Sequence, residues 1–401
     1  MKILIVNTVC KTGSTGKIAY GLHRRLKTAG HESLVCYGRG AVCPLEKDLI
    51  RIASSSEVCV HAALARWTGY AGCYSSQATT RLLRIMDEFR PDVVQLFNLH
   101  GYYLNEFRVL DYLKTKKIKT VYSMLDEYPY MGKCCYPFGC ERFKTGCGSC
   151  PQVRSYPKSL FFDRSAEIFR LKKSAYDGFD NIVFTAPLWA VERAQNSALL
   201  QSKRFEIIDE FVDLGKTFYP RDARGLRAWL EIPAESRIAL TVAPFSDPRK
   251  GGIHFLRLAQ SLKTEALVFV HVGYDGPRRN LPGNFRPVGF VADQNALAAY
   301  YSLADIFVCT SLADTMPNVC LESLACGTPL CGFDSAGIPD VATPEFGIFT
   351  PSGDVPALTD AVKSIPRKTT ERIAACRHYA EKRYSGELFL KKILQLYASL
   401  K

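Results

Sequence analysis

Short apolar runs alternate with amphipathic stretches along the chain. The runs at residues 2–6, 120–124, 237–242, 267–272 and 306–309 contain many β-branched side chains and few polar ones. This pattern is typical of strands buried on both faces, and the stretches between the runs have helical spacing. The alternation predicts an α/β architecture with parallel sheets, and 401 residues are enough for two such domains.

One strand–loop–helix–strand unit carries the clearest candidate site. The strand at 306–309 leads into a polar loop and a helix at 319–326, before a further strand at 330–333. Asp314 lies in the loop and Glu322 in the helix. Ligands bind beyond the carboxyl ends of parallel strands, and helix N-termini attract phosphate. The segment therefore predicts a phosphate-containing ligand, although an ordinary capped helix between two strands has the same pattern.

A pair of cations follows the strand at 237–242. Arg249 and Lys250 lie between that strand and a helix predicted at 253–262. Two fixed cations beside backbone N–H groups suit a diphosphate leaving group. A solvated basic turn is the alternative interpretation.

The loop after the first strand consists of small residues, Gly13, Ser14, Thr15 and Gly16. It is not a Walker A phosphate loop, because Lys11 stands where that motif begins with glycine and Ile18 where it has a hydroxyl. Its backbone N–H groups and the helix expected at 18–27 are still predicted to hold a diphosphate or an anionic acceptor.

Residues 314–329 resemble the donor-binding segment of retaining glycosyltransferases with two Rossmann-like domains, the GT-B fold. That family has Glu-x7-Glu followed by Ala-x-Gly-x-Pro. This chain keeps the spacing with Asp314 and Glu322, then Ala-Cys-Gly-Thr-Pro at 325–329, although its first acid is Asp. The family also has Arg-Lys-Gly in the register of Arg249 and Lys250.

The resemblance implies a nucleoside diphosphate sugar of the UDP or GDP type as donor. Glu322 would hold the ribose hydroxyls, Asp314 would lie near the hydroxyls of the sugar, and Arg249 and Lys250 would neutralise the departing diphosphate. Further donor contacts are expected at Val291, Thr315, Met316, Asn318 and Val319.

A cysteine-rich segment follows the strand at 120–124. Its spacing is Cys-x5-Cys-x6-Cys-x2-Cys, at Cys134, Cys140, Cys147 and Cys150. Four thiolates suit tetrahedral zinc without an open position, so such a site would be structural. Reduced or redox-active thiols and an iron–sulfur cluster are the alternatives. The segment resembles the bacterial capsule, O-antigen and colanic-acid branch of the family, and the resemblance assigns the same quartet.

The acceptor side departs from that branch. The branch usually has His-Asp where this chain has Leu125 and Asp126. Because leucine cannot form a hydrogen bond, the acceptor site would be rebuilt from Asp126 as a catalytic group with His100, Tyr102 and Glu127. The alternative is a weak or inactive relative that acts as a partner subunit.

Composition adds a preference for anionic partners. The hydrophobic content of 47% and charged content of 23% describe a soluble globular protein, and its net charge is +13. No apolar run approaches the roughly 20 residues of a membrane span, and no signal peptide is apparent, so a cytoplasmic protein is expected. Nucleic acid is excluded because no motif combines aromatic and basic residues.

Anionic lipid at the inner face of the plasma membrane is a further expected partner, unless the basic helices are only solvated surface. The basic residues concerned are Lys114, Lys116, Lys117, Arg164, Arg170, Lys172 and Lys173.

We therefore expect two Rossmann-like domains facing across a cleft. Residues 1–212 would form the acceptor domain with an insertion at about 132–152, residues 213–380 the nucleotide-sugar domain, and residues 381–401 a helix returning to the first domain. The expected reaction moves a sugar, with retained configuration, to a saccharide or polyprenyl-linked acceptor in cell-surface polysaccharide synthesis. Two cations on the leaving group make a metal unnecessary for transfer.

Overall fold

The chain forms two compact units. The computed structural model describes residues 1–42 and 45–400, and it divides into unit 1 (Met1–Ile208 with Leu390–Lys401) and unit 2 (Asp209–Phe389). The division precedes the expected boundary at 212/213, because Asp209 and Val212 are bound within unit 2. Arg383 Nε lies 2.9 Å from Asp209 Oδ2, and the Val212 N–H donates to the Tyr384 carbonyl over 3.1 Å.

Unit 1 contains one parallel sheet. Its strand order is β3 (Leu49–Arg51), β2 (Glu32–Arg39), β1 (Lys2–Val9), β4 (Val93–Leu96), β5 (Lys119–Ser123), β6 (Ile182–Ala186) and β7 (Arg204–Ile207). The strand order reverses between β1 and β4, which is where such sheets bind ligands. The expected strand at 181–185 does not close the sheet, because β7 pairs with β6 beyond it. As an edge strand, β7 is half exposed and lacks the apolar pattern of the others.

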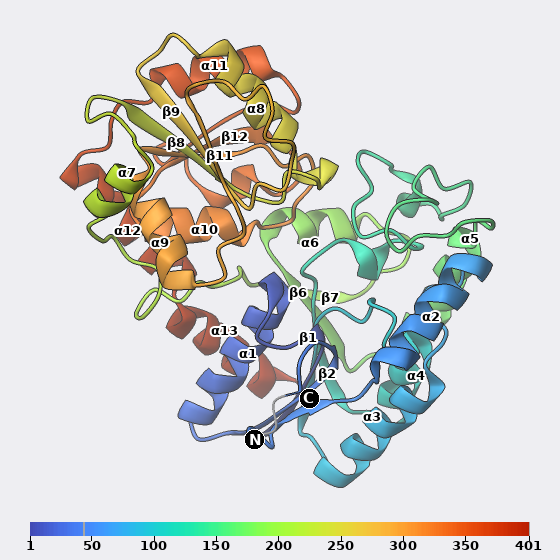
Figure 1. Ribbon diagram of the computed structural model, residues 1–401. Helices are drawn as coiled ribbons and strands as arrows, with labels where there is room; N and C mark the ends of the chain where they lie inside the picture. The colour runs from blue at the N-terminus through green and yellow to red at the C-terminus, as the bar shows by residue number, and fades with distance from the viewer. Residues whose placement is uncertain (43–44, 401) are drawn as a thin grey trace. The chain divides into compact units, whose positions relative to one another are not determined.

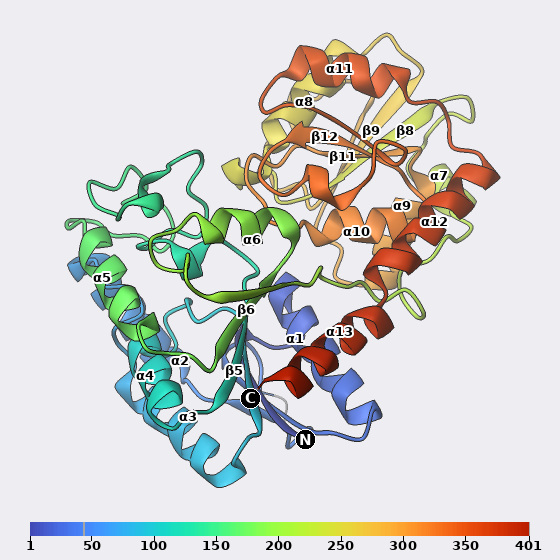
Figure 2. The ribbon, with the colours of Figure 1, turned by 180° about the vertical axis from the view of Figure 1, so that it is seen from behind.

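Helices cover both faces of this sheet (Figures 1 and 2). The helices α3 (Ser76–Phe89), α4 (Glu106–Thr115) and α5 (Ser165–Tyr176) lie on one face. The opposite face carries α1 (Gly13–Thr28) and the end of α13 (Gly386–Ser399). The expected closing helix at 381–401 is two helices, because α12 (Thr370–Tyr384) ends before α13 begins. Tyr397 of α13 donates to Gln95 Oε1 over 2.8 Å, which fixes this segment in unit 1.

Unit 2 contains a second parallel sheet. Its order is β10 (Phe285–Val288), β9 (Leu267–Val272), β8 (Arg237–Val242), β11 (Ile306–Cys309), β12 (Leu330–Asp334) and β13 (Gly347–Pro351). Here the order reverses between β8 and β11. The bounds of β8, β9 and β11 are those predicted from the apolar pattern.

Helices also cover both faces of the second sheet (Figure 1). One face carries α8 (Gly252–Ser261) and α11 (Val355–Ser364), and the other α9 (Gln294–Leu303), α10 (Asn318–Ala325) and α12. Ala239 of β8 packs in the core with α8 and α11, whereas Ile238 and Leu240 pack in the core with α9 and α10. Alternate residues are therefore buried on opposite faces. Within the described residues, none of the helices has the length and apolar character that crossing a bilayer requires.

Two buried lysines hold the long insertion between β5 and α5. Lys172 of α5 donates to the carbonyls of Tyr128 and Met131 over 2.6 and 3.1 Å, and its Nζ lies 3.3 Å from the centre of the Tyr128 ring. Lys133 donates to the carbonyls of residues 152, 153 and 155 over 2.9–3.4 Å. The expectation that Lys172 binds lipid is wrong, because its side chain is fully buried.

We expect Lys172→Met to lower the free energy of unfolding by about 2–5 kcal/mol, because it removes the buried ammonium that donates to the carbonyls of Tyr128 and Met131. Urea unfolding of the full chain measures this loss. Lys173→Met is the matched control, since Lys173 is the next residue of the same helix and is exposed. Equal effects of the two substitutions would contradict the assigned role.

Candidate active site

The candidate site of unit 2 lies at the switch point of its sheet. The loop after β8 carries Arg249 and Lys250, and the loop after the neighbouring β11 carries Asp314. Residues far apart in the sequence thus meet at the carboxyl edge of two adjacent strands, where open parallel sheets bind ligands.

Hydrogen bonds to the backbone carbonyls of Arg249 and Lys250 fasten the two loops together. The Leu312 N–H donates to the Arg249 carbonyl over 2.7 Å, and the Thr310 hydroxyl donates to the Lys250 carbonyl over 3.2 Å. Gly251 permits this approach, because its φ is +67° and a Cβ there would lie 2.0 Å from the Thr310 carbonyl oxygen. The backbone of both cations is therefore fixed relative to β11.

Both cations bind the same carboxylate oxygen. Lys250 Nζ lies 2.5 Å from Asp314 Oδ2, and Arg249 Nη1 lies 3.2 Å from the same atom. Arg249 also donates to the Ala313 carbonyl over 3.0 Å, and Asp247 accepts its backbone N–H over 3.0 Å. An ammonium has three donors and a guanidinium five, so both groups can bind phosphate oxygens while they hold Asp314. We call Arg249, Lys250 and Asp314 the ion cluster.

Glu322 is oriented by a tyrosine that the sequence did not indicate. The Tyr301 hydroxyl of α9 donates to Glu322 Oε2 over 2.7 Å, and both side chains are buried. Burial raises the pKa of Tyr301 well above its usual value, so the hydroxyl remains a donor. One aromatic residue among several in a helix gives no sequence signal for this role.

The loop after β11 is fixed on its other side by Gly337. Its N–H donates to the Asp314 carbonyl over 3.0 Å, and a Cβ there would lie 1.9 Å from the Thr315 carbonyl oxygen. The predicted donor contacts at 315, 316, 318 and 319 lie in this loop or at the start of the helix that follows it. Met316 lies in the core, Val291 and Val319 pack against the same core, Thr315 is buried and Asn318 begins α10.

In unit 1, Gly13, Ser14, Thr15 and Gly16 form the first turn of α1 instead of a free loop. The helix begins at Gly13, earlier than the expected residue 18, because small residues allow it to pack on the end of β1. A Cβ on Gly16 would be 3.1 Å from a methyl carbon of Val9, and Asn7 Nδ2 donates to Thr15 Oγ1 over 3.3 Å.

His100 and Asp126 form a hydrogen-bonded pair at the carboxyl ends of β4 and β5. His100 Nε2 lies 2.7 Å from Asp126 Oδ2, and His100 Nδ1 lies 3.1 Å from the Tyr156 hydroxyl. Asn98 and the Tyr128 N–H donate to the same carboxylate over 3.4 and 3.0 Å. Asp126 therefore fixes the orientation of the His100 imidazole. Tyr156 was not predicted, because 56 positions separate it from His100.

Tyr102 and Glu127 have different surroundings. The Tyr102 ring packs 5.8 Å from that of Tyr156, the residue whose hydroxyl contacts His100. Glu127 is buried and lies 2.7 Å from Arg193 Nε, and it accepts the Tyr130 hydroxyl over 2.7 Å. Burial raises the pKa of Glu127, whereas Arg193 opposes this shift. Glu127 thus forms an internal ion pair.

The cysteines of the described residues form no disulfide with one another. Within residues 1–42 and 45–400, the only group of three or more potential metal ligands with ligand atoms within 4.8 Å of one another is His100, Asp126 and Cys135. The quartet at 134, 140, 147 and 150 forms no such group, so bound zinc would have to draw its sulfurs closer. Burial raises the pKa of Cys134 to about 12. The zinc assignment stays a prediction.

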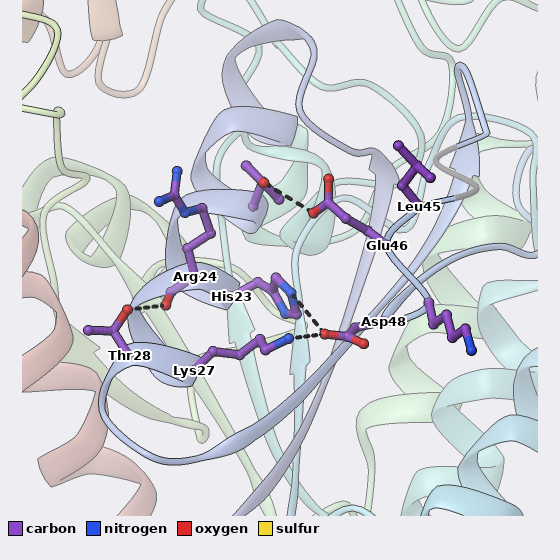
Figure 3. A pocket seen from close by; sticks show the side chains of 9 residues that line it. His23, Arg24, Lys27, Thr28, Leu45, Glu46 and Asp48 are labelled. Atoms are coloured by element: carbon purple, nitrogen blue, oxygen red, sulfur yellow. Dashed lines mark hydrogen bonds and ion pairs between the residues drawn. The ribbon is translucent and has the colours of Figure 1, made fainter.

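A pocket of about 500 Å³ lies elsewhere in unit 1 (Figure 3). Its lining comes from the second half of α1 and residues 45–48. Lys27 pairs with Asp48, and the Tyr20 hydroxyl donates to Glu46 over 3.1 Å. Burial lowers the pKa of His23 to about 4. The acids and bases of this pocket therefore largely satisfy one another, and it shares no residue with the predicted sites.

Part of unit 2 matches a known protein family. Residues 236–367 match the family model described as Glycosyl transferases group 1. The chain is also 24% identical over 420 residues to WcaC of Escherichia coli (strain K12), whose name assigns it to colanic acid biosynthesis as a glycosyl transferase. That alignment covers 100% of both chains.

Solved structures show the same fold over the full length. Sucrose-phosphate synthase of Thermosynechococcus elongatus has a TM-score of 0.70 at 17% identity, with 100% of this chain and 98% of that chain covered. Alr3699/HepE of Anabaena, solved in complex with UDP-glucose, has a TM-score of 0.68 at 15% identity, with 100% of both chains covered. The chain therefore has the GT-B fold of these structures, and its residues 236–367 match the model of glycosyl transferases group 1.

Proposed function

We propose that this chain transfers a sugar from a nucleoside diphosphate sugar to a saccharide or lipid-linked saccharide, with retention, in the synthesis of a cell-surface polysaccharide. The observation that supports it most is the ion cluster, in which two cations converge at the switch point of unit 2. The chain resembles WcaC in sequence and the UDP-glucose complex of Alr3699/HepE in fold, and both resemblances support this proposal.

Arg249 and Lys250 are proposed to bind the diphosphate of the donor. Charge builds on this group as the bond to the sugar breaks, and fixed cations stabilise it without solvent reorganisation. The hydrogen bonds from the Leu312 N–H and the Thr310 hydroxyl keep the backbone of both cations in place before the donor binds. Transfer would then need no metal ion.

Asp314 is proposed to accept hydrogen bonds from hydroxyls of the donor sugar. It is one methylene shorter than the glutamate usual in the family, but the ion cluster holds its carboxylate at the switch point. Glu322, fixed by Tyr301, would bind the ribose hydroxyls. The first turn of α10, at Asn318, would supply backbone N–H groups for the donor phosphate. The first turn of α1, at Gly13, is proposed as a site for a diphosphate or an anionic acceptor.

On the acceptor side, the His100–Asp126 pair is proposed to take the place of the histidine that the family has at position 125. Asp126 orients the ring, so one imidazole nitrogen faces the carboxylate and the other lies beside Tyr156. The family's front-face mechanism needs no carboxylate nucleophile, and none is assigned.

A catalytically inactive partner subunit is the second candidate, because Leu125 cannot make the hydrogen bond of the usual histidine. The two candidates differ in what they predict for turnover. A scaffold can bind a nucleotide, but it does not release one from a nucleotide sugar.

Lys250→Ala is expected to lower turnover at least about a hundredfold, because it removes one fixed cation from the leaving group. Release of nucleoside diphosphate from a panel of UDP- and GDP-sugars measures this effect. Lys263→Ala, which changes an exposed lysine of the same unit, should leave turnover unchanged. Near-normal turnover of Lys250→Ala would remove Lys250 from the mechanism, and no turnover of the unaltered chain would favour the scaffold.

Calorimetric titration tests the role of Glu322 separately from turnover. We expect UDP or GDP to bind, and Glu322→Gln to weaken binding at least about tenfold, because an amide is a poorer acceptor of two ribose hydroxyls. Glu265→Gln is the matched control on an exposed glutamate. If Glu322→Gln bound the nucleotide like the unaltered chain, its assignment to the ribose would be wrong.

Zinc in the cysteine quartet is tested by metal analysis of protein purified without chelator. A structural site predicts about one equivalent, lost in the Cys147→Ser, Cys150→Ser variant but retained in Cys59→Ser, which changes an exposed thiol. Less than about half an equivalent in the unaltered chain would rule out the structural site.

A further inference from the structure

The outward face of α2 (Ser55–Thr68) in unit 1 is apolar. Val60, Leu64 and Trp67 follow one another at helical spacing and are exposed, Trp67 to 64%. Cys59 and Ala63 are exposed on the same side. A helix on the surface of a globular protein normally places polar residues there, because only its inner face packs on a core.

A run of three apolar residues extends this face. Leu160, Phe161 and Phe162 are consecutive and exposed, Phe161 to 61%. The Phe161 ring lies 5.1 Å from the Trp67 ring, and the Leu160 N–H donates to the Arg66 carbonyl over 2.8 Å. We call the combined surface the aromatic patch; its members are Val60, Leu64, Trp67, Leu160, Phe161 and Phe162.

Contacts of Ser159 and Gly69 with the neighbouring backbone fix the position of the aromatic patch on the surface of unit 1. Ser159 donates its hydroxyl to the Phe162 carbonyl over 2.6 Å and its N–H to the Val153 carbonyl over 2.9 Å. Gly69 ends α2 with φ +85°, and a Cβ there would lie 2.7 Å from the Phe162 carbonyl oxygen. The aromatic side chains therefore cannot easily fold back onto unit 1. A contiguous exposed apolar surface of this kind marks a site of association.

Cations border the aromatic patch. Arg66 and Lys158 are exposed, and the Arg164 guanidinium lies 5.4 Å from the centre of the Phe162 ring. Of the nearby acids, Glu167 pairs with Arg164 and Asp163 accepts two backbone N–H groups, so Arg66 and Lys158 supply the net positive charge of the border. The border is therefore complementary to an anionic surface, and the chain as a whole carries a charge of +13.

We propose that the aromatic patch docks unit 1 on an anionic lipid bilayer. Tryptophan and phenylalanine insert at the level of the lipid headgroups, and arginine and lysine beside them bind lipid phosphates. In this mode the protein binds to the surface of the bilayer and does not cross it. It places membrane contact on α2 and residues 160–162 instead of the basic helices expected from the sequence, and it does not depend on the sugar-transfer chemistry.

Vesicle flotation of the full chain tests the inference. The unaltered chain should bind vesicles of phosphatidylcholine mixed with phosphatidylglycerol, and bind those of phosphatidylcholine alone much more weakly. The Trp67→Ser, Phe161→Ser variant should lose at least about tenfold in partition coefficient, because it removes two inserting rings. Arg66→Ser with Lys158→Ser should lose about tenfold on the mixed vesicles only, and added salt should reproduce that loss.

The control variant Trp229→Ser, Phe290→Ser removes two comparably exposed aromatic residues from unit 2, where the exposed fractions are 68% and 87%. It should bind vesicles like the unaltered chain. The proposal is overturned if the unaltered chain does not float with either vesicle, or if the variant of the aromatic patch floats equally well. It is also overturned if sedimentation shows that the patch variant instead abolishes self-association, since the occupant is then a second copy of the chain.

Discussion

The convergence of Arg249 and Lys250 on one oxygen of Asp314 is the interaction on which the account of unit 2 depends. It joins the loops after β8 and β11, which lie 64 and 65 positions apart in the sequence at these contacts. Like charges in a partly buried site repel unless an acid lies between them, so Asp314 makes the arrangement of the two cations stable before a ligand arrives. The hydrogen bonds from the Leu312 N–H and the Thr310 hydroxyl and the absence of a side chain at Gly251 hold this geometry. Preorganised cations are what a diphosphate leaving group needs.

Buried cations also determine the structure of unit 1. Lys172 and Lys133 are buried, and each binds several backbone carbonyls of the insertion between β5 and α5. This segment has little regular structure beyond two short 3-10 turns, so these amines replace the hydrogen bonds that a helix or strand would make. The insertion supplies Tyr156 to the His100–Asp126 pair and Phe161 to the aromatic patch. Its internal bonds thus determine both surfaces.

The pattern of apolar and polar residues in the sequence predicted much of the fold but less of the candidate site. The strands β8, β9 and β11 were predicted to the residue, because strands buried on both faces leave an uninterrupted apolar signal. The edge strand β7 and the start of α1 at Gly13 were missed, because exposure weakens that signal and small residues read as a loop. Family spacing indicated Asp314 and Glu322 and the two cations. Tyr301, Tyr156 and the burial of Lys172 could not be predicted, since they depend on contacts between distant segments.

The central claim is that the ion cluster receives the diphosphate of the donor. A crystal structure of the chain with UDP bound tests it most directly. The account predicts that diphosphate oxygens lie within hydrogen-bonding distance of Lys250 Nζ and the Arg249 guanidinium, with the ribose hydroxyls on Glu322. A diphosphate bound elsewhere, with both cations still bound to Asp314 and to no phosphate oxygen, would contradict it.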